Sequence, residues 1–163
     1  MQIPFRVASY AFLVLSLCLP ARAASPQDDP AVPAILARAE SLFQSMKSRD
    51  YPAVFAALSA KSRETIVAET SSALARDAAP VPEAVRRDFV AGGPIARDYR
   101  DAFLRRFDPD DALEHSRWEI GSVGKDRAEI LLTHHGADHP ATLKMSLEDG
   151  GWKTGLVETF WSR

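Results

Sequence analysis

Apolar and polar residues alternate along the last third of the chain, which is the pattern of half-buried β-strands. Short segments rich in glycine and aspartate, namely Gly-Lys-Asp, Gly-Ala-Asp and Asp-Gly-Gly, interrupt the alternation, and these residues favour turns. We therefore predict four consecutive antiparallel strands. Their expected bounds are residues 117–123, 127–135, 141–148 and 152–161.

The alternation also predicts how neighbouring strands pair, because one face of the sheet must be buried. Asp149-Gly150 is a strong signal for a two-residue hairpin, and Ala137-Asp138 is interpreted as a second two-residue turn. The expected neighbours are Trp118 with Leu132, Ile120 with Ile130, Ile130 with Met145, Leu132 with Leu143, and Leu147 with Trp152. One apolar face results, made of Trp118, Ile120, Ile130, Leu132, Leu143, Met145, Leu147, Trp152, Leu156 and Phe160.

The residues before the strands follow the period of amphipathic helices. Helices are expected at residues 33–49, 51–58, 60–76, 82–91 and 94–106, and residues 108–111 are interpreted as a turn that leads to the sheet. Helices followed by an antiparallel meander indicate an α+β fold, with the N-terminal helices packed on one face of a curved four-stranded sheet.

The N-terminus has the pattern of a secretion signal. A short basic segment precedes an apolar run at residues 7–19, and Ala21-Arg22-Ala23 is a site that a signal peptidase accepts. We expect cleavage after Ala23, a disordered spacer at residues 24–32, and one domain at residues 33–163. Leu15-Ser16-Leu17-Cys18 faintly resembles a lipobox, but Leu17 is large where a small residue is required. Periplasmic or secreted localisation is therefore favoured over a lipoprotein.

Charge and cysteine content exclude several classes of function. The whole chain has a formal charge of −2, and the predicted signal carries two arginines and no acidic residue. The mature chain is therefore more acidic still, which argues against nucleic acid as a partner. The apolar run is too short to span a membrane. Cys18 is the only cysteine and lies in the signal, so the mature chain has no cysteine chemistry, and no cofactor is expected.

Several segments of the sequence resemble those of a known family. A long amphipathic helix precedes the segment Y-x-x-V-F-x-x-L-S, and the chain ends with W-E-I-G-S-V, A-E-I-L-L-T and L-K-M-S-L-E-D-G-G-W-K. This arrangement resembles the nuclear-transport-factor-two-like superfamily, or cystatin-like cone, and in particular its small exported lumazine-binding-like bacterial domains. The resemblance implies that a ligand would lie between the concave sheet and the helices. The superfamily contains isomerases and dehydratases as well as non-catalytic binders.

The predicted registers supply candidate residues for such a site. The expected pocket residues are Trp118, His134 and Met145 on the sheet and Tyr99 and Phe103 on the last helix before it. The same side chains would also serve to fill a core. The resemblance implies an Asp or His base inside the cone, for which His134, Glu158 and Asp98 are the candidates. No second catalytic group is identified for any of them.

Two further clusters have alternative interpretations. His115 and His135 are expected to lie opposite each other on the outer face, near His139, where they would bind a metal, sense pH, or simply form a polar hairpin end. Their spacing matches no standard zinc signature. Arg86-Arg87 and Arg105-Arg106 would contact phosphate or form solvated helix faces.

The leading hypothesis is an exported, non-catalytic module that binds a small apolar ligand or an envelope protein. A small-molecule isomerase or dehydratase with a base inside the cone is the alternative. A homodimer through the outer sheet face is a further hypothesis, although the charge on that face favours a weak interface.

Overall fold

The computed structural model describes residues 25–75 and 81–161, and its predicted signal segment lies outside these ranges. Helices come first and a four-stranded antiparallel sheet follows, so the chain has an α+β fold. The helices are a 3-10 turn η1 (Pro26–Asp28), α1 (Val32–Lys47), α2 (Tyr51–Ala57), α3 (Ala60–Leu74), α4 (Pro82–Ala91), α5 (Pro94–Leu104) and α6 (Pro109–Glu114). The strands are β1 (Ser116–Val123), β2 (Arg127–His134), β3 (Ala141–Glu148) and β4 (Gly151–Gly155), and a short helix α7 (Leu156–Phe160) follows them.

The sheet has the order β1-β2-β3-β4, as the alternation predicts. The pairings of Trp118 with Leu132, Ile120 with Ile130, and Leu147 with Trp152 are confirmed. Asp149 and Gly150 both have positive φ, of 50° and 75°, which is the geometry of a two-residue hairpin turn.

The predicted register between β2 and β3 is wrong by two residues. Ile130 pairs with Leu143 instead of Met145, and Leu132 pairs with Ala141. The connection is longer than the predicted two-residue turn, since β2 ends at His134 and β3 begins at Ala141. Side chains alternate between faces with a period of two, so a shift of two residues leaves the apolar face intact. Ile130, Leu143 and Met145 are accordingly all buried.

The last predicted strand is only half present. β4 ends at Gly155, and residues 156–160 form the helix α7. Thr159 stabilises this turn, because its hydroxyl donates to the carbonyl oxygen of Gly155 at 2.6 Å and accepts from the backbone N–H of Lys144 at 3.0 Å. Leu156 remains buried, but Phe160 is 57 % exposed and does not join the apolar sheet face as predicted.

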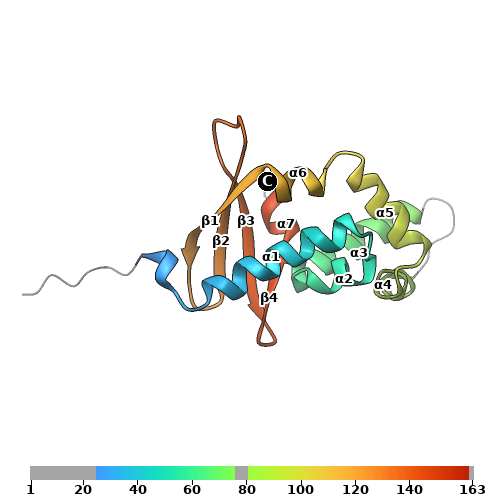
Figure 1. Cartoon of the computed structure of the whole chain (residues 1–163). Coiled ribbons are helices and arrows are strands. Elements are labelled where there is room, and N and C mark those ends of the chain that lie inside the picture. The colour runs from blue at the N-terminus through green and yellow to red at the C-terminus, as the bar shows by residue number, and fades with distance from the viewer. Residues whose placement is uncertain (1–24, 76–80, 162–163) are drawn as a thin grey trace, which may run out of the picture.

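Five of the predicted helices are confirmed within about two residues at each end, a usual uncertainty for helix ends. Residues 109–114, which include most of the predicted turn, instead form α6. Figure 1 shows α1 crossing the sheet and continuing into the group formed by α2, α3, α4 and α5. The inner residues of α1 pack with the apolar sheet face in one core, and fully or almost fully buried members include Ile35, Leu42, Val54, Ile66, Phe89 and Ile130.

Both outer strands of the sheet contact other parts of the chain. Leu58 forms a parallel bridge with Thr154 of β4. The backbone N–H of Ser59 also donates to the carbonyl oxygen of Thr154 at 2.9 Å. At the other edge, the side-chain amide of Gln27 donates to the carbonyl oxygen of Ile120 at 3.1 Å. Gln27 belongs to the segment that the sequence predicts to be a disordered spacer. None of the helices within 25–75 and 81–161 is long and apolar enough to cross a membrane.

Candidate functional site

A pocket of about 290 Å3 opens where β2 ends and β3 begins, and we call it the α6–α7 pocket. The exposed area of its wall is mostly apolar, and its polar lining residues are Arg106, Asp108, Asp111, Ser116, His134, Thr142 and Thr159. The apolar lining comes from α1, the segment before α6, the sheet and α7, through Phe43, Phe107, Leu132, Leu143 and Phe160. A small apolar pocket with a few convergent polar groups is the usual form of a small-molecule site.

The aromatic wall of this pocket continues into the protein. Phe43 lies 5.6 Å from Phe107, between ring centroids, and makes an edge-to-face contact with Trp118 at 5.0 Å. Phe103 packs behind Phe107 at 5.3 Å. Trp118 is further held by a hydrogen bond of 3.0 Å from its indole N–H to the carbonyl oxygen of Ala112 on α6. Such aromatic contacts fix the orientation of the rings and therefore the shape of the pocket.

An ion pair lies at the rim of the pocket. The Nε2 atom of His134 is 2.8 Å from Oδ2 of Asp111, and the Nδ1 atom of His115 is 3.3 Å from Oδ1 of the same carboxylate. His134 ends β2, Asp111 lies on α6, and His115 directly follows α6. The sequence predicted His134 on the inner face and His115 on the outer face. In the structure both contact one carboxylate, because α6 brings Asp111 to the strand ends.

The environment of His134 favours its protonated form. The hydrogen bond to Asp111 raises the pKa of His134 above its ordinary value of 6.5, and the negative charge of Asp111 adds to the rise. The imidazole is half-exposed, so solvent screens this interaction. A histidine stabilised as a cation is a poor general base, because it releases its proton only at higher pH.

The His134–Asp111 pair should make stability depend on pH. The folded-state pKa lies above the unfolded value, so the pair stabilises the fold fully below about pH 6.5, and its contribution is lost as pH rises through the folded-state pKa. We expect His134→Gln to be less stable than the parent at about pH 5.5 and nearly as stable at about pH 9. Urea denaturation across this range measures the difference. A difference that does not change with pH would contradict the role of the pair.

Titration of His134 by NMR provides a direct control. In Asp111→Asn the pKa of His134 should fall, because the neutral amide no longer attracts the imidazolium. Equal pKa values in the two proteins would show that the carboxylate is not the cause.

Four of the five predicted pocket residues do not line the α6–α7 pocket. Trp118 and Phe103 pack against aromatic residues of its wall, and Met145 and Tyr99 lie apart from it. Met145 is buried and contributes to a groove of about 850 Å3 between α3, the sheet and α7. Tyr99 lines a hollow of about 360 Å3 between α3 and α5. Its ring makes an edge-to-face contact with Phe89 at 5.5 Å and lies 5.3 Å from the guanidinium of Arg100. Burial lowers the pKa of Arg100 to about 10.

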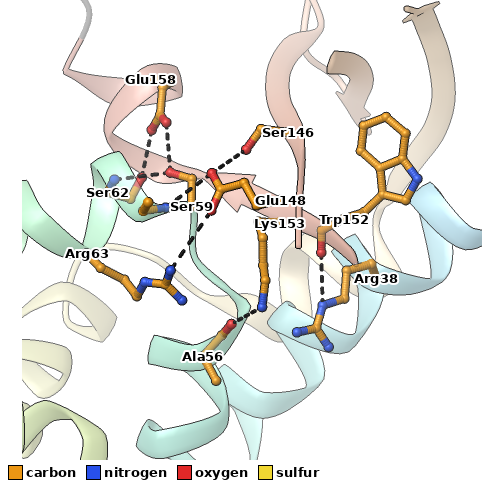
Figure 2. Close-up of polar contacts among 11 residues, drawn as sticks. Arg38, Ala56, Ser59, Ser62, Arg63, Ser146, Glu148, Trp152, Lys153 and Glu158 are labelled. Carbon is orange, nitrogen blue, oxygen red and sulfur yellow. Dashed lines mark hydrogen bonds and ion pairs between the residues drawn. The ribbon is translucent and has the colours of Figure 1, made fainter. Parts of the chain in front are cut away.

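Glu158 belongs to a hydrogen-bond network at the N-terminus of α3 (Figure 2). Its two carboxylate oxygens accept from the hydroxyls of Ser59 and Ser62, both at 2.7 Å, and both serines are fully buried. The Ser62 hydroxyl also accepts from the backbone N–H of Val157 at 3.0 Å. The network therefore joins α7 to α3, and it occupies both oxygens of the proposed base.

The third base candidate and the histidine cluster have separate positions. Asp98 lines the same hollow as Tyr99. His135 is exposed, and its backbone N–H donates to the carbonyl oxygen of His115 at 2.8 Å, so the two residues are neighbours as predicted. His139 is exposed in the connection between β2 and β3. In the described part of the chain, no three His, Cys, Asp or Glu side chains are arranged to hold a metal ion.

The sequence interpretation missed most of the lining of the α6–α7 pocket, since His134 is the only one of the five predicted pocket residues found in it. Asp111 was missed because residues 108–111 were interpreted as a turn. A signal for α6 was present. Asp108 precedes Pro109, and the Asp108 side chain caps the helix by accepting from the backbone N–H of Asp110 at 2.9 Å. Aspartate before proline, followed by further acidic residues, is a typical start of a helix.

No protein-family model, no curated protein and no solved structure matches this chain.

Proposed function

We propose that this protein is an exported, non-catalytic binding module that takes a small apolar ligand in the α6–α7 pocket. The observation that carries the proposal is the apolar wall of this pocket, built from Phe43, Phe107, Leu132 and Leu143, next to a rim of polar groups. The apolar wall would contact the body of the ligand, and His134 and Thr142 would orient a polar substituent. The proposal that the protein is exported rests on the signal pattern of residues 1–23.

Membership of the cystatin-like cone superfamily is part of the same proposal. It is supported by the order of the elements, with helices before a four-stranded antiparallel meander, and by α1 packing against β1 and β4. The α6–α7 pocket is lined from α1 and from the apolar face of β2 and β3, which is where the resemblance implies a ligand.

The contacts of the proposed bases favour binding over catalysis. His134 is held in an ion pair that stabilises its cationic form, and both oxygens of Glu158 accept hydrogen bonds from serine hydroxyls. A general base must be free to take a proton from the substrate. The isomerase or dehydratase alternative therefore has less support from the geometry.

Blocking the pocket entrance tests the proposal. Ala141 is exposed and lines the pocket, so Ala141→Trp should fill it without disturbing the core. Ala137→Trp is the matched control, because Ala137 is exposed in the β2–β3 connection just before Ala141 but lies outside the pocket lining. The uncharged fluorescent probe N-phenyl-1-naphthylamine reports binding by its increase in emission. We expect the first variant to bind it at least about tenfold more weakly than the parent, equivalent to about 1.4 kcal/mol, and the control to bind it normally.

Two results would overturn the assignment of the α6–α7 pocket as a ligand site. One is a parent protein that produces no increase in probe emission. The other is equal binding by the parent and both variants, which would place the probe at another surface. If the probe binds as expected, extraction of the protein from its native compartment, followed by mass spectrometry of the extract, would identify the natural ligand.

A further inference from the structure

Three cationic side chains from different elements lie together on another face of the protein. Arg38 comes from α1, Arg63 from α3 and Lys153 from β4. Figure 2 shows the ammonium of Lys153 between the two guanidinium groups. None of the three lines the α6–α7 pocket. The whole chain is acidic, with a formal charge of −2, so this local concentration of positive charge needs an explanation.

Backbone carbonyls, rather than carboxylates, hold two of the three cations in place. The ammonium of Lys153 donates to the carbonyl oxygen of Ala56 at 2.8 Å, and Nε of Arg38 donates to the carbonyl oxygen of Trp152 at 3.2 Å. Among residues 25–75 and 81–161, neither side chain forms an ion pair. Both are therefore fixed in position while their charges remain available.

The carboxylates near the cluster neutralise it only in part. Glu148 lies 3.9 Å from Arg63, but its oxygens also accept from the backbone N–H of Ala60, at 2.9 Å, and from the hydroxyl of Ser146. The negative charges of Glu148 and Asp149 both raise the pKa of Lys153. Burial lowers the pKa of Lys153, and the charges of Arg38 and Arg63 lower it further. The three cations therefore repel one another in the absence of an anion.

A hollow adjoins this cluster. Its volume is about 650 Å3. Its lining includes the cations Arg63 and Arg86, the carboxylate Asp50, and the apolar residues Pro52, Phe55 and Ala56. Because the ammonium of Lys153 is bonded to Ala56, it lies at the edge of the hollow. A ligand bound here would meet the two guanidinium groups and apolar surface, with Asp50 as the one carboxylate of the lining.

We propose that Arg38, Arg63 and Lys153 bind the phosphate or carboxylate end of a small anionic ligand, whose remaining part lies in the adjoining hollow. An oxyanion accepts charge-assisted hydrogen bonds from guanidinium and ammonium groups together. It also relieves the repulsion among the three cations. The site is independent of the α6–α7 pocket, so either proposal can fail without the other.

The chemical reactivity of Lys153 tests this site in the intact protein. Acetylation by an N-hydroxysuccinimide ester at about pH 8 modifies only the neutral amine, and peptide mapping by mass spectrometry gives the rate at each lysine. A bound anion that raises the pKa of Lys153 by one unit lowers its acetylation rate about tenfold. Lys125 is the internal control, because it is exposed in the loop between β1 and β2. Inorganic phosphate and acetate are tested separately, each against chloride at equal ionic strength.

Variants show which side chains produce the protection. In Arg38→Gln and Arg63→Gln, protection of Lys153 by the anion should be lost or greatly reduced. Arg87→Gln should keep it, because Arg87 is exposed on α4 and does not line the hollow. Each variant is compared with itself, with and without anion, so a change in its stability does not affect the result. Protection by phosphate or by acetate supports the site and identifies the preferred group. Equal rates with phosphate, acetate and chloride, or protection that persists in all three variants, would overturn it.

Discussion

Ile130→Ala is expected to lower the free energy of unfolding by about 2–5 kcal/mol, the usual cost of removing a large aliphatic side chain from a packed core. Ile130 is 0 % exposed. It lies at the centre of β2, between Ile120 on β1 and Leu143 on β3, so its loss would leave a cavity under α1 that neighbouring strands cannot easily fill. Urea denaturation monitored by circular dichroism measures the change.

The adjacent residue provides a matched control for this prediction. Leu131 is only half-buried and points to the opposite face of the sheet. Leu131→Ala should cost about 1 kcal/mol, the usual size for a partly exposed site. Equal destabilisation by the two substitutions would mean that the buried face of β2 has been assigned incorrectly.

Ser62→Ala is expected to destabilise the protein by about 2–4 kcal/mol, although it removes a single oxygen atom. The Ser62 hydroxyl donates to a carboxylate oxygen of Glu158 and accepts from the backbone N–H of Val157. The alanine would leave the N–H of Val157 without its partner in a buried position and remove a charge-assisted hydrogen bond from Glu158. α7 should then detach from α3 before the sheet unfolds.

Ser72→Ala is the control for this network, because Ser72 lies on the same helix but is exposed. Its effect should stay within about 0.5 kcal/mol. Hydrogen exchange adds a local measurement: in Ser62→Ala the amides of residues 156–160 should exchange faster, while those of β2 keep their protection. A Ser62→Ala protein as stable as Ser72→Ala would show that the network does not hold α7.

Local patterns predicted most of the elements. The helical period identified α1, α2, α3, α4 and α5, and the alternation identified β1, β2 and β3. The Asp149-Gly150 turn also set the pairing of Leu147 with Trp152, because a two-residue hairpin leaves a single register. These predictions succeeded because each depends on residues that are close together in the sequence.

The candidate site was only partly predictable, because its polar rim joins distant segments. His134 was identified from its position at the end of an apolar strand face. Its partner Asp111 was not identified, since the helix α6 was interpreted as a turn. The cations Arg38, Arg63 and Lys153 have no common sequence pattern, and they meet only because α1, α3 and β4 pack together.

The sequence by itself determined the α+β order of the elements and the division of the sheet into an apolar and a charged face. Both follow from periodicity, which depends on the geometry of each element alone. Only the tertiary structure decided the conformation of residues 156–160. Residues 156–160 alternate like a strand, but Glu158 bonds to Ser59, 99 residues earlier, and Thr159 bonds to β3. These long-range contacts stabilise a helical turn there, and that turn brings Phe160 to the wall of the α6–α7 pocket.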